Sequence, residues 1–356
     1  MIPVTDRNVI NGLSPYNWVC KDDYISTTVC GAALTVEFRS TRQVTLRVDS
    51  AHIRNAVKSA KRYPVIAWSV NGGAMQSHQL ADGEATVLLA SNAANPVIDL
   101  YVKGMSPFEP RYAGDVPGTA LKITGFGVDG GGVTVAATLP KRIWLNIGDS
   151  ILSGDGAAYA PGAGRPKDDL WAESDDGRAA YGYLLAQHYG YREARVAYGG
   201  YGWVGGLGGV PPLKKLIDQR TSTVQRIEGE RLDPVPDVVL INLGENGVPA
   251  DKDIVEALHK VASRVGKDTQ IIVMVPVSGK GRAVLSRAVE AYQASSGDSR
   301  THLVDLGPIK FATCDGQHPV AEGHQAICKA ALPAFNSIVK RQPDGSCESA
   351  PVAARK

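Results

Sequence analysis

The run Ile143-Trp144-Leu145-Asn146-Ile147, which leads directly into Gly148-Asp149-Ser150, is where this chain changes character. It lacks the strict alternation of apolar and polar residues that a half-exposed strand shows, and this is typical of a strand buried on both faces of a parallel sheet. Further runs of the same kind follow at residues 194–198, 238–243, 271–275 and 303–306.

Segments with helical spacing of apolar residues separate these runs. Ile254, Leu258 and Val261 recur at intervals of three and four residues, and similar spacing occurs around residues 181–188, 284–292 and 326–338. Strands that alternate with helices predict a doubly wound α/β domain. We therefore expect residues 141–340 to form a flavodoxin-like, five-stranded parallel sheet, followed by a loose polar tail at residues 341–356.

The first 140 residues predict a different architecture, because short strand-like runs are separated by turns rich in glycine and asparagine. Residues 43–49 illustrate the pattern, with Val44, Leu46 and Val48 on one face. Many short strands with little helical periodicity predict an all-β sandwich over residues 1–140, which the second resemblance described below makes jelly-roll-like, with one short helix expected at residues 51–62. The other strand-like runs are residues 33–39, 65–70, 85–89, 97–102, 121–126 and 133–135.

Composition narrows the classes of partner. The chain has 38 basic and 36 acidic residues among 356, a formal net charge of +2, so we expect no nucleic acid and no anionic membrane surface as a partner. No apolar run reaches the length of about 18 residues that a membrane span requires. The N-terminal residues 1–7 do not resemble a signal peptide, so we expect a protein that is cytoplasmic as made, virion-associated, or exported with its leader absent. Composition leaves the oligomeric state open.

The cysteines argue against a metal centre. None of the five, Cys20, Cys30, Cys314, Cys328 and Cys347, has the C-x-x-C spacing of zinc or redox motifs, so neither zinc nor thioredoxin-type chemistry is predicted. The acyl-transfer chemistry inferred below implies neither a metal nor an organic cofactor. Cys20 with Cys30, or Cys314 with Cys328, could close a short loop, although free, partly buried thiols are the favoured interpretation.

Residues able to support nucleophilic catalysis follow the predicted parallel strands. Ser150 follows the first strand, Gly199 and Gly200 the second, and Glu245-Asn246 the third, while a late loop carries Asp315 and His318. Because ligands bind at the carboxyl ends of parallel strands, these residues are expected to converge on one edge of the sheet. A serine, a histidine and an aspartate in such a place predict acyl transfer.

At these positions the chain resembles the SGNH (GDSL-type) hydrolases, over roughly residues 142–340 and in four blocks that occur in the family's order. The resemblance implies that Ser150 is the nucleophile, that His318 is the base and that Asp315 orients it. It also implies an oxyanion hole formed by the backbone N–H groups of Ser150 and Gly200 and by the side-chain amide of Asn246. The blocks are Gly148-Asp149-Ser150, residues 197–202, residues 243–246 and residues 315–319.

Some positions leave alternatives open. The family's third block usually reads Gly-x-Asn-Asp, whereas Gly247 stands here in place of the aspartate. Asp305 competes with Asp315 as the partner of the histidine, and Gly199 competes with Gly200 as an oxyanion donor. Asn246, which precedes a glycine, could instead be an ordinary turn residue.

The β-rich half before an SGNH domain adds a second resemblance, to two-domain carbohydrate esterases whose leading domain is a jelly roll. It implies an O-acetylesterase that acts on acetylated carbohydrate. Tyr201, Trp203 and Trp171 are candidates to stack on sugar rings, Glu245 is a candidate substrate contact, and residues 155–176 are expected to form a wall of the cleft. The alternatives are a lipase, thioesterase or O-acetyltransferase of the same fold, or a glycan-binding structural protein of a phage tail or cell surface.

Overall fold

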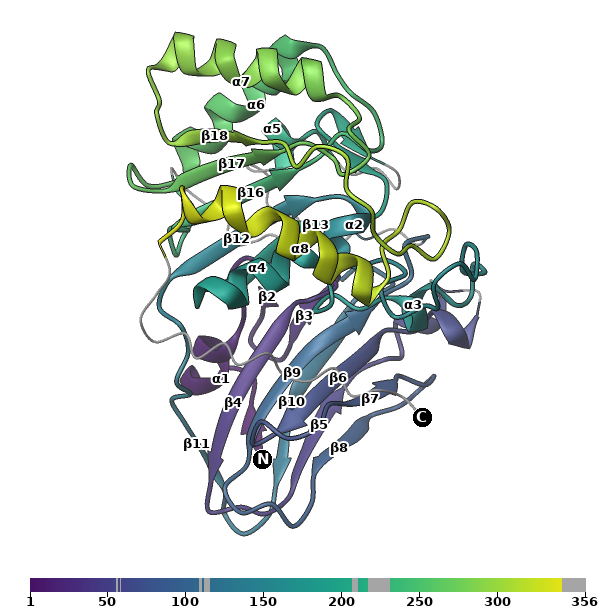
Figure 1. The fold of residues 1–356 in the computed structure, drawn as a ribbon. Coiled ribbons are helices and arrows are strands. Elements are labelled where there is room, and N and C mark those ends of the chain that lie inside the picture. The colour runs from purple at the N-terminus through teal and green to yellow at the C-terminus, as the bar shows by residue number, and fades with distance from the viewer. Residues whose placement is uncertain are drawn as a thin grey trace.

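The structure, a computed structural model, describes residues 1–55, 57, 59–108, 111, 116–206, 211–216 and 231–340. Figure 1 shows an N-terminal half made of antiparallel strands and a C-terminal half in which helices cover a parallel sheet. The tail expected at residues 341–356, which includes Cys347, lies outside the described residues. None of the described helices combines the length and the apolar character needed to cross a membrane.

Eleven strands build the N-terminal half: β1 (Ile2–Pro3), β2 (Val19–Cys20), β3 (Ile25–Thr27), β4 (Ala33–Arg39), β5 (Val44–Val48), β6 (Val65–Val70), β7 (Gln76–Gln79), β8 (Thr86–Ala90), β9 (Val97–Gly104), β10 (Leu121–Val128) and β11 (Val133–Val135). They form two antiparallel sheets. One has the order β2-β3-β10-β5-β8, with β1 paired to β10, and the other has the order β11-β4-β9-β6-β7.

The two sheets share an apolar core because their strands alternate. In β4 and β5 every second residue is buried, as the sequence pattern predicted. Phe38 of β4 meets Phe126 of β10 across this core, edge to face, with ring centroids 5.5 Å apart. The β-structure expected for this half is therefore confirmed, and its sheets are antiparallel.

Short elements in this half differ from the expectation. The helix predicted at residues 51–62 is wrong, because the described residues form two 3-10 turns, η1 (Ile53–Asn55) and η2 (Ala60–Arg62), the second of which Ser59 caps. Helix α1 (Arg7–Gly12) was not predicted, and it is capped by the side chain of Asp6. Strands β1, β2, β3 and β7 have two to four residues, too few to show a period of two.

The C-terminal half contains the predicted parallel sheet. Its strands are β12 (Ile143–Gly148), β13 (Arg192–Ala197), β16 (Val238–Asn242), β17 (Gln270–Met274) and β18 (Thr301–Val304). They lie in the order β13-β12-β16-β17-β18, and every neighbouring pair is parallel. In chain order this arrangement is 2-1-3-4-5, that of flavodoxin, so the predicted five-stranded sheet is confirmed. A hairpin of β14 (Tyr201–Gly202) and β15 (Gly205–Gly206) follows β13.

Helices cover both faces of this sheet (Figure 1). The helices of this half are α2 (Ser150–Ser153), α3 (Trp171–Ser174), α4 (Tyr181–Tyr189), α5 (Leu213–Leu216), α6 (Asp251–Arg264), α7 (Arg282–Ser296) and α8 (Ala321–Asn336). Helices α4 and α8 pack on one face of the sheet and α6 and α7 on the other, whereas α3 lies against β9. Successive residues of β12 enter opposite cores. Leu145 and Ile147 join the core of α6 and α7, whereas Trp144 joins that of α4 and α8, where its ring stacks on Tyr189 and Phe335.

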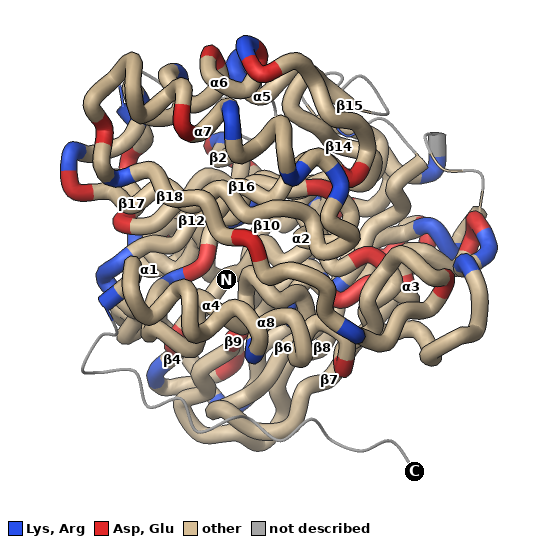
Figure 2. The backbone as a smooth tube through the Cα atoms, turned by 45° about the horizontal axis from the view of Figure 1, so that its top comes forward, with Lys and Arg blue, Asp and Glu red and all other residues tan. Residues whose placement is uncertain are grey.

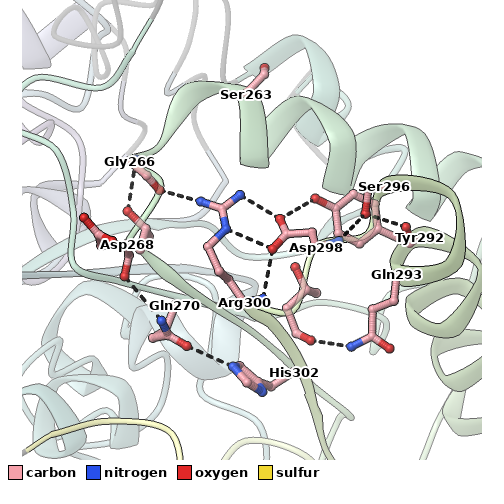
Figure 3. Close-up of polar contacts among 12 residues, drawn as sticks. Ser263, Gly266, Asp268, Gln270, Tyr292, Gln293, Ser296, Asp298, Arg300 and His302 are labelled. Carbon is pink, nitrogen blue, oxygen red and sulfur yellow. Dashed lines mark hydrogen bonds and ion pairs between the residues drawn. The ribbon is translucent and has the colours of Figure 1, made fainter.

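A polar network fixes the beginning of the edge strand β18 (Figure 3). The guanidinium of Arg300 donates to both carboxylate oxygens of Asp298, at 2.9 and 2.6 Å, and to the backbone carbonyl of Gly266. The hydroxyl of Tyr292 also donates to Asp298, at 2.8 Å. The network ties the loop after α7 to the end of α6.

Charged side chains of both signs are interspersed along the chain (Figure 2), in keeping with the formal net charge of +2.

Candidate active site

Ser150 lies at the junction between β12 and the short helix α2. The side chain of Asp149, which is the N-cap of α2, accepts a hydrogen bond from the backbone N–H of Ile151 at 3.0 Å. Glycine is required at position 148, just before Asp149, because a Cβ there would lie 2.4 Å from a side-chain carbon of Leu152. The sharp turn places the hydroxyl of Ser150 at the carboxyl edge of the sheet.

The structure brings Ser150, His318 and Asp315 into one hydrogen-bonded chain. His318 Nε2 lies 3.0 Å from Ser150 Oγ, and His318 Nδ1 lies 2.8 Å from Asp315 Oδ2. When Nδ1–H donates a hydrogen bond to the carboxylate, Nε2 is unprotonated and can accept the proton of the serine hydroxyl. This is the arrangement that activates a hydroxyl as a nucleophile.

Asp315 is suited to hold the imidazole. Burial disfavours its charged form, but hydrogen bonds from the backbone N–H and ring of His318 and from the N–H of Gln317 outweigh burial and lower the pKa of the carboxyl. The rival Asp305 is ion-paired with Arg282 at 2.5 Å instead. The geometry therefore favours Asp315 over Asp305.

The histidine loop is fastened to the nucleophile loop. Within the histidine loop, Cys314 N–H donates to the carbonyl of His318 at 2.9 Å. Directly after the loop, Ala321 N–H donates to the carbonyl of Ala157 at 2.8 Å. Gly323 has to be glycine at the start of α8, since a Cβ would lie 2.1 Å from the carbonyl oxygen of Ala312. The base is thus held by backbone contacts to the segment that follows the serine.

The two remaining blocks meet at the same edge. In the sheet register Gly148 pairs with Ala197 of β13 on one side and with Asn242 of β16 on the other, so the loops that follow begin at one level. Asn246 donates from Nδ2 to the carbonyl of Tyr201 at 3.1 Å and is exposed, while Gly200 has a φ of +74° that suits glycine. Their roles as oxyanion donors stay predictions.

Trp171 lies beside the histidine. Its ring meets the His318 imidazole edge to face, with centroids 5.5 Å apart, and Phe108 packs against Trp171 with centroids 6.4 Å apart. Trp171 is itself 3% exposed, whereas Phe108 is 42% exposed. The guanidinium of Arg165 lies over the Trp171 ring at 5.5 Å. Phe108 was missed from the sequence, because a single aromatic residue after a strand carries no local signal of exposure.

All three aromatic residues predicted to stack on sugar rings need correction, since Trp171 is 3% exposed and the other two are buried as well. Tyr201 and Trp203 are 0% and 1% exposed, and Trp203 donates its indole N–H to the carbonyl of Leu243 at 3.0 Å. Neither ring offers a free face to a sugar, because the hairpin β14–β15 turns both inward. Glu245 is partly exposed, and its carboxylate accepts a hydrogen bond from Ser278 at 2.7 Å, so it fastens the loop after β17.

The cysteines form no bridge at the predicted positions. Cys30 and Cys314 are both free, buried thiols, which leaves neither short loop closed by a disulfide. Burial raises the pKa of the Cys314 thiol to about 11, which keeps it protonated and unreactive. In the part of the chain that the structure describes, no group of three or more His, Cys, Asp and Glu side chains could hold a metal ion.

Comparison with known proteins finds likeness at the level of structure. No protein-family model matches the sequence, and no curated protein matches it. A family two carbohydrate esterase from Clostridium thermocellum, in complex with cellohexaose, is 18% identical with a TM-score of 0.69, over 90% of this chain and 98% of that one. An acetyl xylan esterase from Butyrivibrio proteoclasticus is 17% identical with a TM-score of 0.71, over 92% and 95%.

A third neighbour has a different activity. A salicylyl-acyltransferase from a tetracycline biosynthetic pathway is 15% identical with a TM-score of 0.63, over 96% of this chain and 99% of that one. The chain thus has the SGNH hydrolase fold and resembles carbohydrate esterases along nearly its whole length. At these identities the likeness concerns the fold.

Proposed function

We propose that this protein is a serine esterase that removes O-acetyl groups from carbohydrate through an acyl-enzyme intermediate at Ser150. The observation that carries the proposal is the hydrogen-bonded chain from Ser150 Oγ through His318, at 3.0 Å, to Asp315, at 2.8 Å. Residues 141–340 would supply the catalytic domain, and residues 1–140 an accessory domain.

In the first half of the reaction, Ser150 Oγ attacks the acetyl carbonyl carbon while its proton passes to His318 Nε2. The carbonyl oxygen becomes an oxyanion, for which the backbone N–H groups of Ser150 and Gly200 and the amide of Asn246 would be donors. Collapse breaks the bond to the sugar oxygen, which takes the proton from His318. The acetyl group then remains on Ser150.

In the second half, water replaces the sugar. His318 takes a proton from the water as its oxygen attacks the acyl carbon, and the collapsing intermediate releases acetate while His318 returns the proton to Ser150 Oγ. Asp315 stabilises the imidazolium in both halves and does not need to accept its proton. No step calls for a metal or an organic cofactor.

A carbohydrate acceptor is supported by the surroundings of the base. Trp171, which packs against His318, is 3% exposed and has no open ring face, but the ring of Phe108 that packs on it is 42% exposed. Aromatic faces of this kind bind the apolar faces of sugars. Two solved neighbours of the fold are carbohydrate esterases, and one is named for acetyl xylan.

The acyltransferase among the neighbours favours a second candidate, transfer of the acyl group to an acceptor other than water. Both reactions share the acyl-enzyme and differ only in what attacks it. Lipase and thioesterase activities would also proceed through an acyl-enzyme. They differ from each other in the leaving group, which is an alcohol for a lipase and a thiol for a thioesterase. A purely glycan-binding role would not require the three side chains to be hydrogen-bonded in series.

The test is release of acetate from acetylated xylan, glucomannan and other acetylated glycans by the purified protein, with Ser150→Ala as the paired variant. We expect acetate release by the wild type and a loss of at least about 10³-fold in the variant. A chain-length series of p-nitrophenyl esters separates lipase from acetylesterase. Equal turnover by Ser150→Ala and wild type would disprove the nucleophile assignment.

A further inference from the structure

Strand β9 presents one face to each half of the molecule. Ile98, Leu100 and Val102 point into the core between the two antiparallel sheets. The intervening residues Asp99, Tyr101 and Lys103 share the opposite face of the strand, because side chains alternate along it. β9 lies at the centre of its sheet, between β4 and β6, so this face cannot shift independently of the sheet.

All three residues of this face bind one short segment of the C-terminal half, residues 173–178. Asp99 accepts two hydrogen bonds from the guanidinium of Arg178, at 2.5 and 2.8 Å, and Tyr101 donates its hydroxyl to Asp176 at 3.1 Å. Lys103, which is 7% exposed, donates from Nζ to the backbone carbonyls of Glu173, at 2.8 Å, and Asp175, at 2.6 Å.

The contact is close enough to exclude side chains. A Cβ on Gly104 would lie 2.0 Å from the carbonyl oxygen of Ala172, and a Cβ on Gly177 would lie 2.4 Å from the backbone nitrogen of Gly31. Gly177 N–H also donates to the carbonyl of Lys103 at 3.0 Å. Backbone therefore packs on backbone where the two halves join, near α3 in Figure 1.

The same segment continues to the loop that follows the serine. Asp176 N–H donates to the carbonyl of Gly154 at 3.0 Å, and Ala158 N–H donates to the carbonyl of Ser174 at 2.7 Å. The buried carboxylate of Asp175 accepts from Gly156 N–H at 3.0 Å. Residues 154–158 are thus held on one side by residues 173–178, and Ala157 receives the histidine loop on the other.

We propose that this face of β9 is a brace for the catalytic centre, and that Lys103 is a positioning residue of the esterase. By holding the carbonyls at the end of α3, Lys103 fixes the helix whose first residue, Trp171, lies against His318. It also fixes the segment that supports residues 154–158. The β-rich half is then part of the catalytic apparatus, and the inference rests on the proposed esterase reaction.

The test compares Lys103→Met, which keeps the length of the side chain and removes its donors, with Lys103→Arg and with Lys122→Met. Lys122 is a partly buried lysine of β10 that binds Asp49, and it is the matched control because its ion pair lies in the other antiparallel sheet. With p-nitrophenyl acetate we expect Lys103→Met to lose at least about tenfold in kcat with KM within about twofold. Lys103→Arg should recover part of the loss, and Lys122→Met should match the wild type.

Hydrogen–deuterium exchange supplies a readout that does not depend on activity. We expect faster exchange in peptides covering residues 150–160 and 310–320 of Lys103→Met, and unchanged exchange in the same peptides of Lys122→Met. Unchanged exchange together with unchanged kcat in folded Lys103→Met would overturn the brace. An inactive wild type would refute the esterase, while faster exchange in the variant would still support the brace.

A milder variant covers the case in which Lys103→Met does not fold. Tyr101→Phe removes only the hydroxyl that donates to Asp176. We expect a loss of kcat of roughly two- to fivefold and faster exchange over residues 150–160. If both quantities equal those of the wild type, the proposed brace is wrong.

Discussion

The indole ring of Trp171 and the imidazole of His318 pack in a T-shaped arrangement, with ring centroids 5.5 Å apart and planes inclined at 77°. This contact limits how far the imidazole can rotate. Asp315 and Trp171 thus both restrain the imidazole ring, which in the proposed reaction accepts the proton of Ser150.

The identity of the carboxylate partner can be tested directly. Asp315→Asn should lower kcat by about 10²–10⁴-fold, because an amide cannot hold the imidazole in the required tautomer or stabilise the imidazolium. Asp305→Asn is the matched control, since Asp305 pairs with Arg282 and not with the histidine. The measurement is kcat for p-nitrophenyl acetate, and a larger loss in Asp305→Asn would reverse the assignment.

The oxyanion role of Asn246 predicts a loss confined to the transition state. Asn246→Ala should lower kcat by about 10²–10³-fold and leave KM nearly unchanged, because the donor acts on charge that develops only during reaction. Ser278→Ala controls for disturbance of the loop, as Ser278 binds the neighbouring Glu245. Comparable losses in both variants would mean that loop structure, and not the amide, is responsible.

The elements that could be predicted are those whose own sequence carries the signal. Buried parallel strands show as continuous apolar runs, and their parallel pairing follows from alternation with helices. Once the strands are placed, Ser150, Gly200 and Asn246 fall at strand ends by chain position alone. The hydrogen bonds of His318 could be expected because Asp315 and His318 share one short loop.

What could not be predicted depends on contacts between distant segments. Tyr201 and Trp203 lie in a glycine-rich stretch that suggested an open loop, yet the hairpin β14–β15 buries both rings. The contact of Lys103 with residues 173–178 joins positions about 70 apart in the chain. The sequence pattern of neither segment predicts that it contacts the other. Lysine is rarely buried without a partner, so only the fold shows that backbone carbonyls fill this role.

The exposed ring of Phe108 predicts a contribution to binding of glycan and none to the chemistry. Phe108→Ala should raise KM for an acetylated oligosaccharide by about 5–10-fold, the loss of one aromatic stacking contact of roughly 1 kcal/mol. The KM for p-nitrophenyl acetate should stay within about twofold. Leu88→Ala, at an exposed apolar residue of β8, is the control. An equal rise in KM for both substrates would argue against a sugar platform.

The network around Arg300 predicts a pH-dependent contribution to stability. The hydrogen bond from Arg300 lowers the pKa of Asp298 to about 2. A carboxyl with a lowered pKa stabilises the fold above its unfolded value, near about 4, and this contribution disappears as the pH falls toward 2. Asp298→Asn should therefore cost about 1 kcal/mol at neutral pH and less at about pH 3. Urea unfolding at both pH values measures it, and a constant difference would contradict the linkage.

The buried carboxyl of Asp149 should give stability the opposite dependence on pH. Burial raises the pKa of its carboxyl to about 7, and the nearby carboxylates of Glu245 and Asp155 add to the effect. The unfolded chain loses this proton near about pH 4, so between about pH 4 and 7 the folded state holds a proton that the unfolded state lacks, and stability falls as the pH rises. The amide introduced by Asp149→Asn would be neutral throughout and could still accept the hydrogen bond of Ile151.

The stability of Asp149→Asn relative to wild type should therefore increase between about pH 4 and pH 7, on the order of 2–4 kcal/mol in total, and then level off. Chemical unfolding in small steps of pH measures the difference, in which titrations common to both proteins cancel. Asp6→Asn is the matched control, because Asp6 also caps a helix but lies at a partly exposed position. A parallel rise in both variants would show that burial beside Ser150 is not the cause, since Asp6 lacks that burial.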